Sequence, residues 1–411
     1  MNRPLRRSTS PSARAGQGGA ACSAQPEGAE MQQDSGAGDL VINGKFTSQR
    51  ITGVQRVARE LTAALQQLLG ADARLPVIVP RDALPQRARL RDETASPSRL
   101  TGLLWEQFAL PLETRGSMLV SLCNMGPLFK RRQIVMIHDA AVYDVAQNYS
   151  WKFRWWYRLA FRVMKHRAAH FVTVSAFSKR RIVAHLGIDE ARISIVHNGA
   201  DHLDRIDADP DILARLGLRE DAYGLIVGSL SAAKNLTRVL AALKRMEGRL
   251  DARFVIVGGG NARIFGEAIV GAAELPGNVL MAGAVTDGEL KALYQGAACF
   301  IFPSLYEGFG LPPLEAMRCG CPVIASREAS LPEVCGDAAL YCDAYSVEDI
   351  ADKITRMMAE PALRERFRAR GLARAKEFGW AAAARELLAI AQRVAGRGRH
   401  GGGRDYFEVT Q

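Results

Sequence analysis

Residues 298–325, ACFIFPSLYEGFGLPPLEAMRCGCPVIA, carry the pattern that decides the fold. The apolar residues 299–302 predict a short buried strand, and the run 323–325 predicts a second one. Between them lies a glycine-bearing loop, followed by a helix that we expect to begin near Leu311, because a proline pair is tolerated in the first turn of a helix. A strand, loop, helix and strand in this order are typical of a parallel α/β sheet.

Two carboxylates lie beside this helix start. Glu307 is on the loop, and we expect Glu315 in the first helical turn. The N–H groups of a helix start have no partner within the helix, so they favour an anion near the loop. Gly308 and Gly310 allow the backbone to approach a ligand closely. Taken alone, Glu315 would equally suit a role of complementing the helix dipole.

The same alternation of apolar runs and helix-length segments occupies two stretches of the chain, separated by a polar, acidic region around residues 201–221. It predicts an α/β fold with two doubly wound, Rossmann-like domains that face each other across a cleft, where ligands of this class bind. The expected segments are a disordered tail (1–38), the first domain (39–205), the second domain (206–376), a further helix (377–395) and a basic, flexible tail (396–411). Residues 81–100 are polar and irregular.

The charge of the chain is unevenly distributed. The 411 residues carry a formal net charge of +11, yet no acidic residue lies between Asp144 and Asp189, where basic and aromatic residues alternate. This pattern over 149–181 predicts contact with an anionic membrane surface. The alternative is a solvated helix whose aromatic side packs on its own domain. No nucleic-acid-binding motif accompanies the patch, so we expect no nucleic-acid partner.

Other site classes are disfavoured by composition and spacing. No stretch reaches the ~18 apolar residues of a membrane span, and no apolar run follows the early arginines as in a secretory signal. We therefore expect a cytoplasmic protein. The seven cysteines lack metal-ligand spacing, so we expect no metal. The glycines at 258–260 lack the remainder of a dinucleotide fingerprint, since the next strand, NVLMAG, ends without an acidic residue.

Residues 300–326, FIFPSLYEGFGLPPLEAMRCGCPVIAS, resemble the donor-site motif of glycosyltransferase family 4, retaining sugar transferases with a GT-B fold. Further matching motifs occur in the family's order over residues 40 to 395, and many spaced motifs are more specific than one fingerprint. In the first domain these are Asn43-Gly44, Thr52–Arg56, Ile137-His138-Asp139, Thr173-Val174-Ser175 and Asn198–Asp201. In the second they are Val227–Leu230 with Lys234-Asn235, Leu331–Val334 and Phe378–Trp380.

The resemblance implies transfer of a sugar from a nucleoside-diphosphate donor to a hydroxyl of a growing, lipid-linked glycan in cell-surface polysaccharide synthesis. It implies that residues 39–205 form the acceptor domain, that residues 206–376 form the nucleotide-sugar donor domain, and that the helix over 377–395 returns to the first domain. It implies no cofactor and no metal. Likeness to bacterial polysaccharide mannosyltransferases makes GDP-mannose the first candidate donor, at the inner face of the plasma membrane. A departing diphosphate gains charge and needs fixed donors around it. Two other functions stay open: a nucleotide-sugar 2-epimerase, which would need no acceptor, and a non-catalytic nucleotide-sugar-binding subunit, which would show no turnover.

Site roles follow from the same resemblance. Catalytic roles fall to His138, at a strand end and in contact with the reacting sugar or acceptor, and to Glu307, on the donor sugar. The donor-binding residues are Gly53, Gly228, Ser229, Lys234, Glu307, Gly308, Phe309, Gly310, Leu311 and Glu315, with Lys234 on the diphosphate and Glu315 on the ribose. Relatives carry an arginine where Ser229 or Ala233 stands here, so the residue that completes the diphosphate site stays open. Arg56 serves either the diphosphate or the solvent-facing surface.

Overall fold

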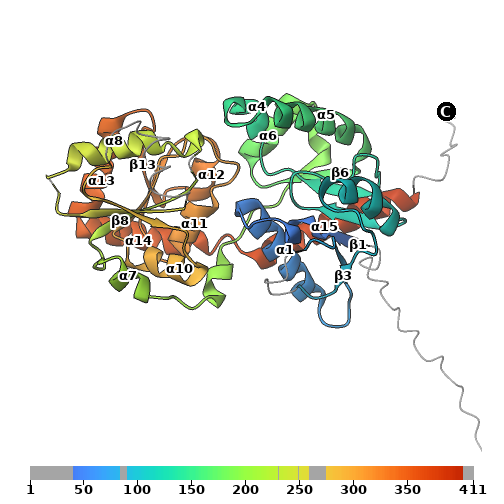
Figure 1. Ribbon diagram of the computed structural model, residues 1–411, viewed down its shortest axis with the longest axis horizontal. Helices are drawn as coiled ribbons and strands as arrows, with labels where there is room; N and C mark the ends of the chain where they lie inside the picture. The colour runs from blue at the N-terminus through green and yellow to red at the C-terminus, as the bar shows by residue number, and fades with distance from the viewer. Residues whose placement is uncertain (1–39, 84–89, 230, 249, 259–274, 401–411) are drawn as a thin grey trace, which may run out of the picture. The chain divides into compact units, whose positions relative to one another are not determined.

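The computed structural model describes residues 40–83, 90–229, 231–248, 250–258 and 275–400. The expected disordered tail (1–38) lies outside these ranges, as do Gly259, Gly260 and residues 401–411 of the expected basic tail. Within the described ranges, the chain forms two parallel β-sheets, each flanked by helices (Figure 1). The predicted α/β class is confirmed.

The first sheet has seven parallel strands in the order β3-β2-β1-β4-β5-β6-β7. They are β1 (Leu40–Asn43), β2 (Val77–Val79), β3 (Glu93–Ala95), β4 (Met118–Ser121), β5 (Gln133–Met136), β6 (His170–Thr173) and β7 (Ile193–Ile195). The helices of this part are α1 (Gly53–Leu69), α2 (Gly102–Leu104), the π-helix η3 (Trp105–Ala109), α3 (Leu110–Glu113), α4 (Ala141–Asp144), α5 (Trp151–Arg167) and α6 (Ala176–Leu186). Every residue of β1, β4, β5 and β6 is buried, as expected for parallel strands covered on both faces.

The second sheet has six parallel strands in the order β10-β9-β8-β11-β12-β13. They are β8 (Tyr223–Val227), β9 (Arg253–Val257), β10 (Val279–Gly283), β11 (Cys299–Phe302), β12 (Val323–Ser326) and β13 (Ala339–Cys342). Its helices are α7 (Asp211–Arg215), α8 (Leu236–Met246), α10 (Asp287–Gly296), α11 (Leu311–Arg318), α12 (Leu331–Cys335), α13 (Val347–Ala359) and α14 (Pro361–Ala375). The quoted stretch forms β11, α11 and β12 as predicted.

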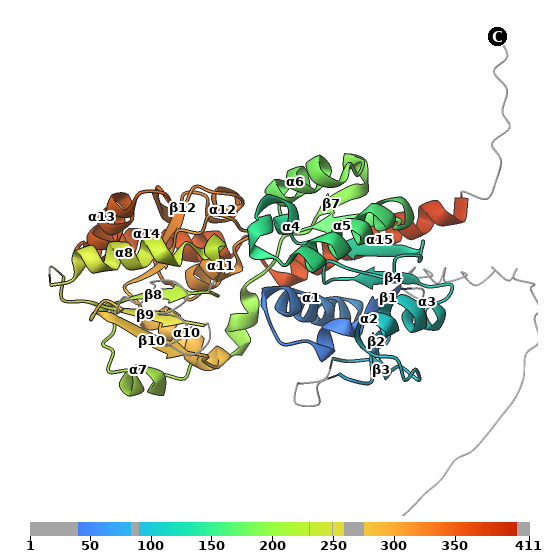
Figure 2. The same cartoon turned by 45° about the horizontal axis from the view of Figure 1, so that its top comes forward.

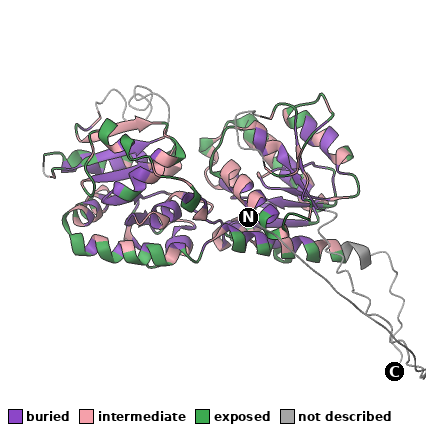
Figure 3. Cartoon of the chain, turned by 90° about the horizontal axis from the view of Figure 1, so that it is seen from below, coloured by how far each residue is buried: buried purple, intermediate pink, exposed green. Residues whose placement is uncertain are grey.

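The side-chain alternation of the strands divides the core of the second sheet between two faces. Ile226 and Ile301 pack with α8, α13 and α14, whereas Leu225 and Phe300 pack with α10, α11 and α12. Figure 2 shows α8 and α13 on one side of β8–β10 and α7 and α10 on the other. Figure 3 shows the buried residues concentrated on the strands and on the inward sides of the helices. Helices thus lie against both faces of this sheet, and the carboxyl ends of the strands are where a parallel sheet places its ligands.

The long helix α15 (Trp380–His400) follows the second sheet and returns to the first, where it packs along α1. Leu387 and Ile390 share one core with Leu61 and Leu65 of α1. The predicted return helix is therefore present. It runs to His400, five residues beyond the predicted end at 395, so the start of the expected flexible tail is helical.

Two elements in the first half of the chain were not predicted. The edge strand β3 lies within residues 81–100, and the helical segment from Gly102 to Glu113 follows shortly after. The sequence of β3, ETA, shows no alternation of apolar and polar residues. The strand is short and lies mostly exposed at the edge of the sheet, so it needs no buried face. The strand β3 exists because it pairs with β2, and this pairing has no local signal in the sequence.

Candidate functional site

A hollow of about 400 Å³ collects the carboxyl-end loops of both sheets. It brings together all but one of the predicted site residues: Gly53, His138, Gly228, Ser229, Lys234, Glu307, Gly308, Phe309, Gly310 and Leu311. Thr52, Asp139, Val174 and Asn198 contribute to the same walls. Residues from six distant segments thus converge on one volume, as expected of a binding site at the strand ends of α/β domains.

The start of α11 forms the floor on the side of the second sheet. Gly310 precedes the helix with a φ of 100°, a conformation that favours glycine. Pro312 and Pro313 have no N–H, so the backbone donors at this helix start come from Phe309, Gly310 and Leu311. These N–H groups suit an anion without any side-chain charge.

Gly308 is held against the first domain. A Cβ at this position would lie 2.5 Å from the carbonyl oxygen of His138, so only glycine fits. The Gly308 carbonyl accepts hydrogen bonds from the hydroxyls of Ser175 (2.6 Å) and Ser178 (2.9 Å). The predicted close approach at Gly308 is thus to the protein's own backbone in this structure. The sequence motif Thr173-Val174-Ser175 contained one of these serines, but its role came only from the fold.

Lys234 and Glu307 contact each other directly. The Lys234 Nζ lies 2.6 Å from Glu307 Oε1, and the same carboxylate oxygen lies 2.6 Å from the Ser304 hydroxyl. Lys234 Nζ also lies over the ring of Phe302, 4.9 Å from its centroid. The side chains keep 23% and 13% of their exposure, so both charges reach the hollow. Lys234 therefore places a cation at the hollow, and its counter-ion in this structure is Glu307.

His138 follows β5 and is buried beside the hollow. Its Nε2 lies 2.8 Å from the carbonyl oxygen of Leu122, an oxygen that can only accept. Burial lowers the pKa of His138 to about 4. The imidazole is therefore neutral near pH 7, with its proton on Nε2 and an accepting lone pair on Nδ1.

Gly53 is the first residue of α1, and Thr52 and Gln55 form a capping box at that helix start. No atom lies within 4 Å of the position that a Cβ on Gly53 would occupy. The space beside Gly53 opens into the hollow. Packing inside the protein therefore does not require glycine at position 53.

Glu315 does not line the hollow. Its predicted place in the first turn of the helix is also wrong. It is in the second turn of α11, whose first turn carries no acidic residue, so complementing the helix dipole does not explain it. The residue is only 6% exposed. One carboxylate oxygen lies 3.4 Å from the Tyr294 hydroxyl, and the other lies 3.3 Å from Nε2 of buried His202. The helical turn that follows the two prolines rotates this side chain toward the core.

Arg56 does not face solvent freely. Its guanidinium, 19% exposed, binds Asp287 at the start of α10 with both terminal nitrogens, at 2.5 and 3.1 Å. Burial alone lowers the pKa of Arg56, but the hydrogen bond to Asp287 and the charge of Glu315 outweigh it and raise the pKa. Arg56 therefore forms an ion pair between the two sheets and does not simply face solvent.

Two further polar connections join the sheets, and neither was predicted. Glu333 of α12 accepts hydrogen bonds from the N–H groups of Ala176 (2.8 Å) and Phe177 (3.2 Å) at the start of α6. The Tyr306 hydroxyl donates to Asp144 at 2.9 Å. Such contacts between residues far apart in sequence have no local pattern. The motif Leu331–Val334 was the one available signal for Glu333.

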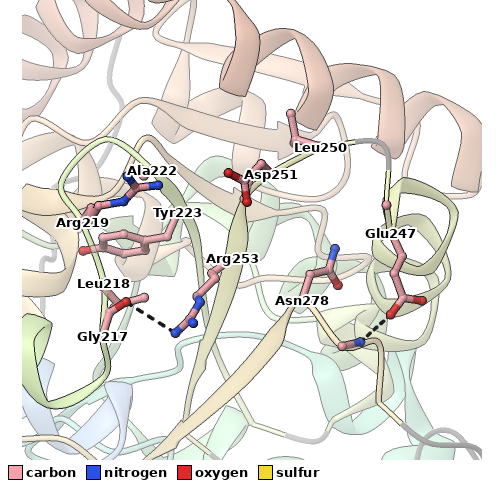
Figure 4. Close-up of a pocket in the computed structure, with 13 residues that line it drawn as sticks. Gly217, Leu218, Arg219, Ala222, Tyr223, Glu247, Leu250, Asp251, Arg253 and Asn278 are labelled. Atoms are coloured by element: carbon pink, nitrogen blue, oxygen red, sulfur yellow. Dashed lines mark hydrogen bonds between the residues drawn. The ribbon is translucent and has the colours of Figure 1, made fainter.

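A larger hollow, about 610 Å³, lies at the opposite edge of the second sheet (Figure 4). It is lined by residues that precede β8, β9 and β10, among them Arg219, Glu247 and Asn278. This is the amino-terminal edge of the strands, remote from every residue of the predicted motifs. Its mixed charges and exposed rim give it no converging set of functional groups, so size does not identify the site here.

Family models match both halves of the chain. The model "Glycosyltransferase Family 4" matches residues 51–202, and the model "Glycosyl transferases group 1" matches residues 210–374. The chain belongs to the glycosyltransferase family that these two models describe. The two matches cover the segments that carry the first and the second sheet, so the family assignment from the motifs is confirmed.

Several curated relatives are mannosyltransferases. O-antigen chain mannosyltransferase B of Escherichia coli is 36% identical over 51% of this chain and 56% of that protein. The serotype-specific mannosyltransferase WbdA of Escherichia coli is 34% identical over 39% of this chain and 20% of that protein. O-antigen chain mannosyltransferase RfbU of Salmonella typhimurium is 24% identical over 77% of this chain and 93% of that protein. The chain thus spans about half or less of the first two relatives.

Solved structures of glycosyltransferases share the fold. Sucrose-phosphate synthase from Thermosynechococcus elongatus aligns with a TM-score of 0.68 and 19% identity, over 87% of this chain and 99% of that one. WaaG, a glycosyltransferase involved in lipopolysaccharide biosynthesis, aligns with a TM-score of 0.66 and 16% identity, over 86% and 99%. The predicted GT-B fold is confirmed.

Proposed function

We propose that this protein transfers a hexose from a nucleoside-diphosphate sugar to a hydroxyl of a growing glycan, with retention of anomeric configuration. Mannose, supplied by GDP-mannose, is the first candidate. The observation that carries the proposal is the hollow in which Lys234, Glu307, His138 and the N–H groups at the start of α11 converge. The mannosyltransferase names of several relatives support the choice of sugar.

Each group in the hollow suits one part of such a donor. The Lys234 ammonium and the N–H groups of Gly310 and Leu311 would stabilise the departing diphosphate. The Glu307 carboxylate would accept hydrogen bonds from hydroxyls of the donor sugar. Neutral His138, with an accepting Nδ1, would bind a sugar hydroxyl without adding a charge near the anomeric carbon.

The chemical step needs no resident cofactor. The bond from the anomeric carbon to the diphosphate oxygen breaks, and its electron pair leaves with the diphosphate. The acceptor oxygen then bonds to the anomeric carbon on the same face, and its proton passes to the departing phosphate oxygen. A glycosyl-enzyme adduct detected by mass spectrometry would contradict this front-face route.

A lipid-linked acceptor at an anionic membrane, on its cytoplasmic face, is the second part of the proposal. The solvent face of α5 supports it: Trp151 is 69% exposed, Trp155 is 62% exposed, and Leu159 follows one turn later at 39%. Lys152, Arg158 and Arg162 are also exposed. Exposed tryptophans beside cations suit the interface of an anionic bilayer.

The packing of α5 separates two groups of aromatic residues. Phe161 is buried against the first sheet, and Trp156 and Tyr157 pack partly against the same core. This part of the helix fits the alternative that the aromatic side packs on its own domain. The exposure of Trp151 and Trp155 does not fit it.

More exposed apolar side chains extend this surface. Phe108, Leu112 and Phe129 are 62%, 74% and 72% exposed. Buried neighbours of the first two pack with Val41 and Leu119, and α5 packs with Val135 and Phe171. Strand register and side-chain alternation put these core residues on one face of the sheet, so Phe108, Leu112 and the exposed residues of α5 lie on the same side of it. Apolar exposure of this extent is typical of an interaction surface. None of the described helices has the length and apolar character of a membrane span.

The test of the activity is a thermal-shift panel of GDP-mannose, UDP-glucose, UDP-N-acetylglucosamine and ADP-glucose, followed by incubation with octyl hexosides and mass spectrometry. We expect GDP-mannose to raise the melting temperature, because a ligand that binds only the folded state stabilises it. Product should form only when an octyl hexoside is present. Conversion of the nucleotide sugar without any acceptor would instead support an epimerase, and binding without turnover would support a non-catalytic subunit.

A further inference from the structure

The hydroxyl of Ser330 lies against the loop that forms one wall of the proposed donor site. It is 2.9 Å from the carbonyl oxygen of Glu307 and 2.8 Å from that of Phe309. A hydroxyl has one proton, so the two carbonyls share it. Ser330 is fully buried at the start of α12 and is not among the residues that line the hollow. It therefore holds the loop from behind.

The local structure around Ser330 does not explain the serine. A serine just before a helix usually caps that helix with its side chain, but the Ser330 side chain makes no capping hydrogen bond to α12. The preceding residue, Ala329, has a φ of 56°, a left-handed conformation that a residue with a Cβ rarely adopts. Such a conformation costs free energy and persists where the surrounding structure requires it. The turn thus directs the Ser330 hydroxyl to the loop instead of to its own helix.

The two carbonyls that Ser330 holds determine where two N–H groups point. In a planar trans peptide, the C=O and the N–H that follows it point to opposite sides. The N–H groups of Gly308 and Gly310 therefore point away from Ser330, to the side of the loop that lines the hollow. Neither N–H donates a hydrogen bond to another residue that the structure describes. Gly310 is buried, and buried backbone donors are rarely left unpaired, so its N–H suits a ligand.

Glycine makes both of these peptides easy to turn over. Rotation of a peptide plane changes the φ of the residue that follows it, and the residues that follow are Gly308 and Gly310. Glycine adopts φ of either sign without a steric penalty. A turned peptide would present a carbonyl oxygen to the diphosphate in place of an N–H group, and the two would repel. The hydroxyl of Ser330 bonds to the carbonyls only in the observed orientation, so it opposes this rotation.

The peptide between these two is held from the first sheet. The Gly308 carbonyl accepts from the Ser175 hydroxyl at 2.6 Å, and the Ser175 oxygen itself accepts from the N–H of Ser178. The Ser178 hydroxyl lies 2.9 Å from the carbonyl oxygens of both Gly308 and His138, so its proton has two acceptors. Ser175 is therefore the more specific partner of the Gly308 carbonyl.

We propose that Ser330 and Ser175 are positioning residues of the transferase, which hold the loop carbonyls so that the N–H of Gly310 faces the donor diphosphate. This proposal rests on the proposed function, and it names the groups that keep the diphosphate site in shape. Because the two serines act from opposite sheets, the site depends on both halves of the chain. It also gives a role to the motif Thr173-Val174-Ser175.

The test compares nucleotides that differ by one phosphate group. Calorimetry gives the Kd for GDP and GMP, and in parallel for UDP and UMP, in the wild type, Ser330→Ala and Ser175→Ala. The ratio of the monophosphate Kd to the diphosphate Kd isolates the terminal phosphate. Ser96→Ala is the matched control, because Ser96 is also buried and its hydroxyl donates to Glu113 at 2.6 Å, outside the hollow. Thermal melts report the stability of each variant.

We expect Ser330→Ala to reduce this ratio roughly 10-fold, because a hydrogen bond to a charged group loses its orientation. The Kd for the monophosphate should stay unchanged. The kcat for transfer to an octyl hexoside should also fall, since negative charge on the departing diphosphate grows in the transition state. Ser175→Ala should shift the ratio in the same direction. Ser96→Ala should lower the melting temperature and leave the ratio as in the wild type.

Three results would overturn the proposal. The first is an unchanged ratio in Ser330→Ala and Ser175→Ala, and if one of them does not fold, the other decides. The second is equal weakening of monophosphate and diphosphate binding, which would make the serines purely structural. The third is a wild type that binds both nucleotides equally well, because no N–H would then serve the terminal phosphate. Failure of the proposed function looks different, since the wild type would then bind no nucleoside diphosphate and transfer no sugar.

Discussion

The Nζ of Lys234 and the Oε1 of Glu307 are 2.6 Å apart, so the cation and the carboxylate expected to bind one donor bind each other in this structure. A diphosphate that reaches Lys234 must compete with this carboxylate. Release of Glu307 from Lys234 would at the same moment free it for the sugar hydroxyls. Because of this exchange, substitutions of Lys234 and of Glu307 should have different effects on donor binding and on sugar transfer.

We expect Glu307→Gln to tighten the binding of GDP by roughly 3- to 10-fold and to reduce sugar transfer at least 100-fold. The amide keeps the size of the side chain but removes the negative charge that competes for Lys234. Calorimetry with GDP and a transfer assay measure the two effects. Lys234→Ala is the matched variant and should weaken GDP binding at least 10-fold. Equal weakening by both substitutions would contradict the exchange.

Substitution of Gly53 tests the approach of a ligand to α1. The added methyl group of Gly53→Ala meets no protein atom within 4 Å, so the melting temperature should stay the same or rise slightly. Donor KM should nevertheless rise about 10-fold, because the methyl group would occupy space beside the donor. Steady-state kinetics and thermal melts check both results.

Gly44→Ala provides the contrast. Its Cβ would lie 2.4 Å from the carbonyl oxygen of Ile78, so this variant should lose stability. Wild-type donor kinetics in Gly53→Ala would show that no ligand comes near this helix start.

The buried, neutral state of His138 predicts a pH-dependent stability. Its pKa is lowered from 6.5 to about 4 by burial, so between these values the unfolded chain binds a proton that the folded chain does not. The contribution is fully present above pH 6.5 and is lost as the pH falls toward 4. At pH 5 the loss is about 2 kcal/mol of unfolding free energy.

Urea unfolding of the wild type and of His138→Gln at pH 7 and pH 5 measures this effect. Glutamine can still donate from its amide to the Leu122 carbonyl but does not titrate. The drop between the two pH values should be about 2 kcal/mol smaller in the variant. Identical drops would mean that His138 is protonated in the folded protein.

The exposed face of α5 predicts selective binding to anionic vesicles. We expect the double substitution Trp151→Ala and Trp155→Ala to reduce co-sedimentation with vesicles of 30% phosphatidylglycerol about 10-fold, because two interfacial side chains are lost. Charge reversal at Lys152, Arg158 and Arg162 should abolish the preference for anionic over zwitterionic vesicles. The Tyr345→Ala protein is the control for loss of an exposed aromatic residue. Equal binding to both kinds of vesicle by the wild type would contradict membrane docking through this face.

Local patterns predicted the elements that carry strong periodicity. The strand at 299–302 and the helix start at Leu311 follow from apolar residues and prolines within a few positions of each other. The short polar strand β3 has no such pattern and depends on its pairing with β2. The same reasoning found the residues around Lys234 and Glu307, because they lie in compact motifs, but not their ion pair, which joins positions 73 residues apart.

The sequence by itself determined that this chain forms two parallel α/β domains of a glycosyltransferase family and named most residues of the hollow at the carboxyl ends of the strands. It did so because burial of parallel strands and glycine or proline at loop positions impose constraints on neighbouring residues. The tertiary structure alone decided that Glu315 is buried beside His202, that Arg56 is paired with Asp287, and that the Ser330 hydroxyl lies against two carbonyls of the donor loop. These relationships depend on distances between segments that meet only after folding, and no local spacing encodes them.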